Sequence, residues 1–175
     1  MPRFGAIDVG SNAMRLRVVE ANGPDQVREV ASERAAVRLG HDVFLTGRLA
    51  PAALAEAVDA LRGFREVMRG AGVEAYRAVA TSAVREAHNA DLLVERAHRE
   101  AGIKLDVIEG VEEARLVLVA VQNAVRLGDR RALLIDIGGG SVELTVLARA
   151  RRTPPSPSRW APCGCTRPSS TATGP

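Results

Sequence analysis

Two glycine turns, far apart in the chain, constrain its fold more than any other feature of the sequence. Residues 7–12 read Ile-Asp-Val-Gly-Ser-Asn, and residues 135–141 read Ile-Asp-Ile-Gly-Gly-Gly-Ser. In each, an apolar strand ends in a turn that contains aspartate, glycine and a hydroxyl, and a second strand follows. Glycine lets backbone amides approach a phosphate closely, and the aspartate can hold a cation or orient water. Two such loops facing each other would clamp a polyphosphate and its metal ion.

The alternative for each loop is an ordinary hairpin turn, which has the same residue types. The three consecutive glycines Gly138, Gly139 and Gly140 argue against it in the second loop. Relative to alanine, a glycine lowers the stability of the fold by roughly 0.5–1 kcal/mol wherever no special backbone conformation is needed. The presence of both loops in the same chemical order therefore favours phosphate binding.

The hydrophobic pattern predicts a three-stranded meander followed by alternating helices and strands. Strands are expected over 4–9, 14–20, 26–34, 75–80 and 104–108, and helices over 51–70, 90–101 and 111–125. A last pair of strands, 132–136 and 142–147, repeats the strand, loop, strand arrangement of the N-terminus. This order predicts an α/β fold with a mixed sheet flanked by helices, in which ligands gather beyond the strand ends.

The charge distribution argues against nucleic acid as a partner. The chain of 175 residues has a net charge of +3, but residues 148–175 hold five arginines and no acidic residue. Without them 19 basic residues stand against 21 acidic ones, so residues 1–147 carry −2. No apolar run approaches the ~20 residues of a membrane span, and the N-terminus lacks the layout of a secretion signal. We therefore expect no membrane partner and a cytoplasmic location.

Residues 148–175 are expected to be disordered, because they are rich in proline, serine, threonine and arginine and have almost no periodic apolar residue. The alternative is a frameshift near residue 148. Back-translating residues 159–166 and reading one phase over permits Met-Gly-x-Val-Arg-Leu, which would suit a strand that leads into a helix.

Five segments stand in a specific joint order along residues 1–147. They are 6–12, 38–40 (Arg-Leu-Gly), 81–87 (Thr-Ser-Ala-Val-Arg-Glu-Ala) with Asn89, 110–115 (Gly-Val-Glu-Glu-Ala-Arg) and 135–141 with Glu143. In these segments the chain resembles the exopolyphosphatase and guanosine-pentaphosphate phosphohydrolase family, a branch of the superfamily of sugar kinases, actin and chaperone ATPases. The shifted-frame Met-Gly-x-Val-Arg-Leu also resembles what this family places next.

The resemblance implies a fold of two lobes. Residues 1–128 would form a ribonuclease H-like, actin-like ATPase lobe with a mixed five-stranded sheet and flanking helices. Residues 129–147 would be the opening hairpin of a truncated second lobe, and 148–175 a disordered, frameshifted tail. The full-length parent is expected to be a homodimer.

The resemblance also implies Mg²⁺-dependent hydrolysis of a terminal phosphoanhydride, in polyphosphate or guanosine pentaphosphate. Glu113 would activate the attacking water. Asp8 and Asp136 would anchor Mg²⁺ directly or through water, with Glu143 beside the second loop as a further carboxylate of the metal site. The implied phosphate-binding residues are Arg85, Gly10, Ser11, Asn12, Gly138, Gly139, Gly140 and Ser141.

Residue chemistry alone leaves some of these roles open. Glu112 and Glu113 both open a helix, where carboxylates are common because they offset the positive helix end. Glu113 could lie across from the two glycine loops, where a positioned base accelerates the reaction about 10²–10⁴-fold. Glu112 would then be its exposed neighbour. Arg115 is expected to be solvated or to pair along its helix, and Arg38 to lie on the surface.

The three histidines offer no alternative catalytic group. His41 is expected in a loop, and His88 and His98 around one helix with no metal-like grouping. A catalytic triad with Ser82 or Ser141 has no positional support.

These observations predict a phosphohydrolase, and the sequence does not choose between the two substrates. With only the opening hairpin of a second lobe, the 175-residue chain is expected to be weakly stable and to have little activity. The alternative is a nucleotide or phosphate sensor that binds through the same loops without hydrolysis. A sugar or acetate kinase is disfavoured, because the Gly-x-Glu-Glu-Ala-Arg segment is not expected there.

Overall fold

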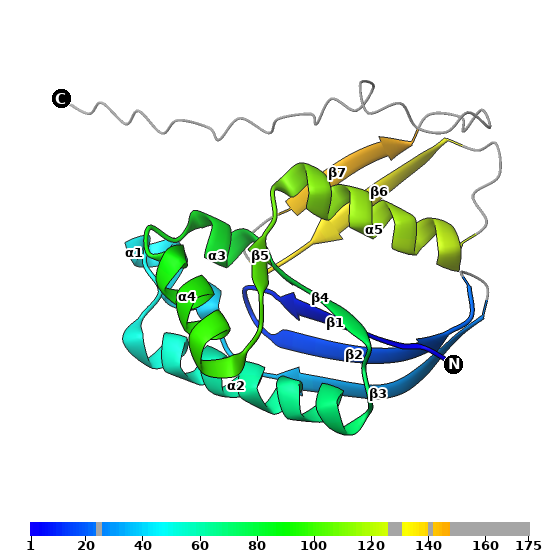
Figure 1. Ribbon diagram of the computed structural model, residues 1–175. Helices are drawn as coiled ribbons and strands as arrows, with labels where there is room; N and C mark the ends of the chain where they lie inside the picture. The colour runs from blue at the N-terminus through cyan, green and yellow to red at the C-terminus, as the bar shows by residue number, and fades with distance from the viewer. Residues whose placement is uncertain (24–25, 126–130, 140–141, 148–175) are drawn as a thin grey trace.

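Among the residues that the structure describes, the larger of two sheets has five strands and forms the frame of the fold. A computed structural model describes residues 1–23, 26–125, 131–139 and 142–147 (Figure 1). The strands are β1 (Arg3–Val9), β2 (Met14–Ala21), β3 (Val27–Ala35), β4 (Ala75–Ala80) and β5 (Leu105–Val107), in the order β3-β2-β1-β4-β5. The β1/β2 and β2/β3 pairs are antiparallel, while β1/β4 and β4/β5 are parallel. The mixed five-stranded sheet predicted from the sequence is confirmed.

Five helices accompany the sheet in the described part of the chain: α1 (Leu39–Thr46), α2 (Pro51–Gly70), α3 (Ser82–Glu86), α4 (Ala90–Ala101) and α5 (Gly110–Ala124). The predicted helices correspond to α2, α4 and α5. The short helices α1 and α3 were not expected from the sequence, and the prediction of a loop at His41 is wrong, because His41 lies in α1. Helix α1 has no side-chain cap and spans only eight residues. Tertiary packing of its buried residues Leu39 and Val43 therefore decides its conformation.

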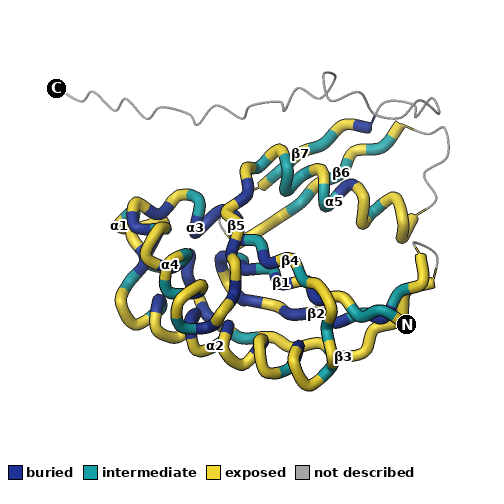
Figure 2. Tube along the Cα trace, in the orientation of Figure 1, coloured by how far each residue is buried: buried dark blue, intermediate teal, exposed yellow. Residues whose placement is uncertain are grey.

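The core lies between one face of the sheet and helices α2 and α4 (Figures 1 and 2). Strand alternation places Ile7, Val9, Met14, Leu16 and Val18 on that face, each with at most 1% of its surface exposed. The helices contribute Leu54, Val58, Leu61, Phe64, Met68, Leu93 and Ala97. A Cβ at Gly5 would lie 2.6 Å from Met68 Sδ, so a side chain there would have to displace the Met68 side chain from the core.

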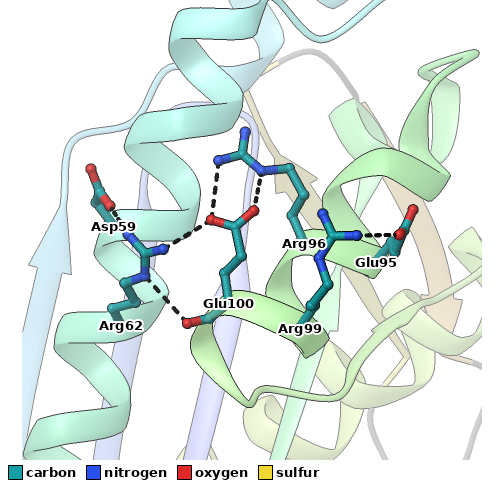
Figure 3. Close-up of polar contacts among 6 residues, drawn as sticks. All are labelled: Asp59, Arg62, Glu95, Arg96, Arg99 and Glu100. Atoms are coloured by element: carbon teal, nitrogen blue, oxygen red, sulfur yellow. Dashed lines mark hydrogen bonds and ion pairs between the residues drawn. The ribbon is translucent and has the colours of Figure 1, made fainter.

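A charged network joins α2 and α4 outside the core (Figure 3). Arg62 donates to Asp59 Oδ1 at 2.7 Å and to Glu100 Oε2 at 2.9 Å, while Arg96 donates to Glu100 Oε1 at 2.7 Å. The hydrogen bond from Arg96, followed by the charges of Arg96, Arg62 and Arg99, holds the pKa of Glu100 below its ordinary value against the effect of burial.

This network predicts an acid-dependent contribution to stability. A carboxylate whose pKa is lowered on folding stabilises the fold above its unfolded pKa, and this contribution is lost as pH falls through the folded pKa. We expect Glu100→Gln to lower the unfolding temperature at neutral pH and to make its decline below about pH 4.5 shallower. Thermal unfolding followed by circular dichroism across the acid range measures this. Glu56→Gln, at an exposed position of α2, is the control, and equal acid profiles for both variants would contradict the prediction.

A separate hairpin consists of β6 (Ala132–Ile137) and β7 (Val142–Leu147), which pair antiparallel. It lies with α5 on the side of the five-stranded sheet opposite α2 (Figure 1). One hairpin face is apolar and exposed, and its residues are Leu133, Ile135, Ile137, Val142, Leu144 and Val146. On the other face Asp136 and Glu143 are direct cross-strand partners.

Several predictions from the sequence fall outside the described residues. They are the boundary between residues 128 and 129, the disordered or frameshifted segment 148–175, and the placements of Gly140 and Ser141. The division into lobes therefore stays a prediction. Within the described part of the chain, no helix is both long and apolar enough to cross a membrane.

Candidate functional site

The first glycine loop joins β1 to β2 and is closely tied to neighbouring elements. The Gly10 amide donates to the Ala13 carbonyl at 3.2 Å, and the Gly40 amide donates to the Ser11 carbonyl at 2.8 Å. Ser11 is buried, and its Oγ lies 2.9 Å from Ser82 Oγ at the start of α3. Only one hydroxyl of such a pair donates to the other, so one proton of the pair remains available to a further acceptor. This loop is thereby fixed against the helix that carries Arg85.

The second glycine loop meets the first one directly. A Cβ built on Gly139 would lie 2.6 Å from Asn12 Nδ2 and 2.7 Å from Asn12 Cγ. Any side chain at Gly139 would have to displace Asn12. The two loops predicted to face each other are therefore in contact in the described part of the chain, and Gly138 beside this contact is exposed.

Arg85 connects α3 to the first turn of α5. Its Nη1 donates to the Ile108 carbonyl at 2.8 Å and to Glu113 Oε2 at 3.0 Å. Both charged side chains are about four-fifths buried, with exposed fractions of 20% and 19%. Among the described residues, Nε and Nη2 of Arg85 have no hydrogen-bond acceptor. A guanidinium presents five donors, so this free edge can bind two oxygens of a phosphate.

The neighbouring glutamates of α5 have different surroundings. Glu113 pairs with Arg85, whereas Glu112 binds Arg77 from β4 and Arg115 from its own helix. The hydrogen bond and charge of Arg115, together with Arg77, lower the pKa of Glu112 from 4.5 to about 2. A carboxylate with so low a pKa is a poor proton acceptor near neutral pH. The expected pairing of Arg115 along its helix is confirmed, and Glu113 is the better candidate base.

Three further carboxylates lie around Glu113. Burial raises the pKa of Asp8, and the negative charges of Glu113 and Asp136 raise it further, while the positive charge of Arg15 lowers it. Burial likewise raises the pKa of Glu143, assisted by the charges of Glu113 and Asp136 and opposed by that of Arg85. These mutual effects place Asp8, Asp136, Glu143 and Glu113 within electrostatic reach of one another.

Burial and neighbouring negative charges both disfavour the ionised carboxylates in this arrangement. Asp136 and Glu143 are directly opposite on the β6/β7 ladder, where like charges repel. Glu143 Oε2 is buried and finds no hydrogen-bond partner among the described residues, and Glu143 Oε1 would lie 3.5 Å from a Cβ on Gly110. In the described part of the chain no three His, Cys, Asp or Glu side chains are close enough to form a metal cluster.

Sequence reasoning missed three participants in this arrangement. Ser82 was part of a recognised segment but received no role, although its hydroxyl contacts Ser11. The carbonyl of Ile108 and the guanidinium of Arg77 also went unassigned. Nothing in the local pattern could have identified Ile108 and Arg77, because their partners Arg85 and Glu112 lie 23 and 35 positions away in the chain.

The chain is similar to known proteins over most of its length. Residues 18–167 match the Ppx/GppA phosphatase family. The chain is 36% identical to exopolyphosphatase 1 of Mycobacterium leprae over 143 residues, which cover 82% of this chain and 42% of that protein. It is also 36% identical to the guanosine-5'-triphosphate,3'-diphosphate pyrophosphatase of Aliivibrio fischeri, covering 83% of this chain and 29% of that protein. The chain thus spans less than half the length of these relatives.

Solved structures give the same result. A crystal structure of an exopolyphosphatase from Cytophaga hutchinsonii superposes with a TM-score of 0.80 at 35% identity, covering 85% of this chain and 47% of that one. The Aquifex aeolicus member of the Ppx/GppA family superposes with a TM-score of 0.74 at 30% identity, covering 85% and 48%. Sequence and structure agree, and the chain belongs to the Ppx/GppA phosphatase family.

Proposed function

We propose that this chain carries the phosphate-binding and catalytic groups of a phosphohydrolase. Its substrate would be inorganic polyphosphate or guanosine pentaphosphate, from which it releases the terminal phosphate. The observation that carries the proposal is the pairing of Arg85 with Glu113 beside two glycine loops in contact. The names of the relatives, exopolyphosphatase and guanosine-5'-triphosphate,3'-diphosphate pyrophosphatase, support the same reaction class.

The proposed chemistry follows from the surroundings of each group. The free edge of Arg85 and the amides of the glycine loops bind and orient the terminal phosphate. Glu113 accepts a proton from a water molecule whose oxygen attacks the terminal phosphorus. The bond from that phosphorus to the bridging oxygen breaks, and the shortened phosphate chain leaves with the bonding electrons. Positioning and charge neutralisation account for most of the catalysis of such transfers.

Magnesium fits the carboxylates beside the second loop. Its usual ligands are one or two carboxylates together with waters and substrate phosphates, so a cluster of three protein ligands is not required. Asp136 and Glu143 offer hard oxygen donors, including the buried Oε2 of Glu143, which has no hydrogen-bond partner among the described residues. Asp8 lies within electrostatic reach. When bound, Mg²⁺ would neutralise negative charge on the phosphate oxygens.

The test combines turnover with a binding measurement. We expect Mg²⁺ to support phosphate release and chelation by EDTA to abolish it, with polyphosphate and guanosine pentaphosphate compared as substrates. We also expect Mg²⁺ to raise the unfolding temperature of the unmodified chain but not of Glu143→Gln. Without Mg²⁺, Glu143→Gln should be more stable by about 0.2–1 kcal/mol, because a cross-strand repulsion is removed.

Glu56→Gln is the matched control and should respond to Mg²⁺ like the unmodified chain. Release that persists in EDTA would contradict the metal assignment. Binding of both substrates without any release would favour the sensor. A cytoplasmic location, a homodimeric parent and low activity of the 175 residues stay predictions from the sequence.

A further inference from the structure

Helix α5 holds the candidate base but is weakly anchored by its apolar residues. Glu113 lies in its first turn, yet Leu118 is the only buried residue of the helix. Figure 2 shows α5 mostly in the colours of intermediate and exposed residues. Its N-cap residue, Glu109, makes no side-chain hydrogen bond to the helix. Most helical stability in proteins comes from packing of an apolar face, so other contacts must fix the direction of this first turn.

Arg77 supplies such a contact from the sheet. It lies on β4 in register with Ala6 of β1, between residues Tyr76 and Ala78. Because Ala78 and Ala80 are buried against the core helices, alternation places Arg77 on the opposite, open face of the sheet. Figure 1 shows α5 on this side.

The contact itself involves a fully engaged carboxylate. Nη1 and Nη2 of Arg77 both lie 3.3 Å from Glu112 Oε1. Arg115 donates from Nε to Glu112 Oε2 at 2.6 Å and from Nη2 to Oε1 at 2.9 Å. The pair between Glu112 and Arg115 is an ordinary one along a helix, three residues apart. Arg77 converts it into a tertiary contact between α5 and β4.

The first turn of α5 is therefore held at two points by two different elements. Glu112 is bound to β4 through Arg77, and Glu113 is bound to α3 through Arg85. Adjacent helical residues point about 100° apart, since a turn has 3.6 residues. Two contacts in different directions define the rotation of the helix about its axis, which one contact alone does not.

We infer that Arg77 and Glu112 are positioning residues whose ion pair holds the first turn of α5 so that Glu113 reaches Arg85 and the bound phosphate. The inference rests on the proposed role of Glu113 as the base. Displacing a catalytic group by about 1 Å can cost 10²-fold in rate, so a modest loosening of this turn has a measurable effect.

The experiment compares Arg77→Gln, Glu112→Gln and the conservative Arg77→Lys in the full chain. Turnover of tripolyphosphate with Mg²⁺ is measured with separation of kcat from KM. We expect both glutamine variants to lower kcat about tenfold with KM within about twofold, and Arg77→Lys to restore part of the loss. Arg99→Gln, which breaks an exposed pair with Glu95 on α4, is the control and should leave both constants unchanged.

A second readout does not need turnover. The Glu113 carboxyl carbon and the Arg85 side-chain nitrogens are followed by NMR, and we expect their resonances to shift in Arg77→Gln but not in Arg99→Gln. If the unmodified chain releases too little phosphate to measure, in line with the low activity expected from its sequence, these resonances still decide the inference. Unchanged resonances in Arg77→Gln would overturn it. A second result would also overturn it: a fall in kcat that is accompanied by a fall in the unfolding temperature and is not recovered in Arg77→Lys. The ion pair would then be merely structural.

Discussion

Replacing Glu113 with glutamine is expected to slow phosphate release about 10²–10⁴-fold, the usual contribution of a positioned general base. Glutamine keeps the shape of the side chain and can still accept the Arg85 hydrogen bond, but it cannot take a proton from the attacking water. Binding of tripolyphosphate with Mg²⁺ should stay within about a factor of two, since the free edge of Arg85 and the glycine loops are untouched. Release is measured as free phosphate, and binding by isothermal titration calorimetry.

Glu95→Gln is a suitable control, because Glu95 is an exposed residue of α4 in a pair with Arg99. It should match the unmodified chain in both assays. If Glu113→Gln released phosphate at the original rate, Glu113 would not be the base. A chain that binds the ligand equally well with and without Glu113 and never releases phosphate would be a sensor.

Replacing Arg85 with methionine is expected to weaken binding of tripolyphosphate at least about 10²-fold. A hydrogen bond to a charged group contributes about 1.5–3 kcal/mol, and the free edge of Arg85 can form two of them with a phosphate. The variant also leaves the Ile108 carbonyl and the largely buried Glu113 without the donor that they share. Turnover should therefore fall further than binding, since Glu113 loses the contact that orients it. Titration calorimetry and phosphate release measure the two effects separately.

Arg99→Met provides the matched loss of one arginine at an exposed position. Arg85→Lys should fall between the two, because an ammonium retains the charge but not the fork geometry. Circular dichroism checks that each variant is folded. Undiminished phosphate binding by a folded Arg85→Met chain would remove Arg85 from the site.

Much of the fold follows from local patterns in the sequence. Period-two and three-to-four spacing of apolar residues located all five strands of the main sheet and the helices α2, α4 and α5. Helices α1 and α3 were not predicted, because they are short and their conformation depends on the packing of buried residues such as Leu39 and Val84. The glycine turns pointed to the two loops, and the contact between Gly139 and Asn12 agrees with their predicted approach.

By itself the sequence determined the order of the strands and of helices α2, α4 and α5, the family and the residue types of the candidate site. These depend on neighbours in the chain, whose spacing is visible without the fold. Only the tertiary structure decided how the adjacent residues Glu112 and Glu113 differ. Arg77 and Arg85, which distinguish them, lie 35 and 28 positions away and reach α5 from β4 and α3. Because the two glutamates point in different directions from one helix, folding pairs Glu112 with two arginines and Glu113 with Arg85.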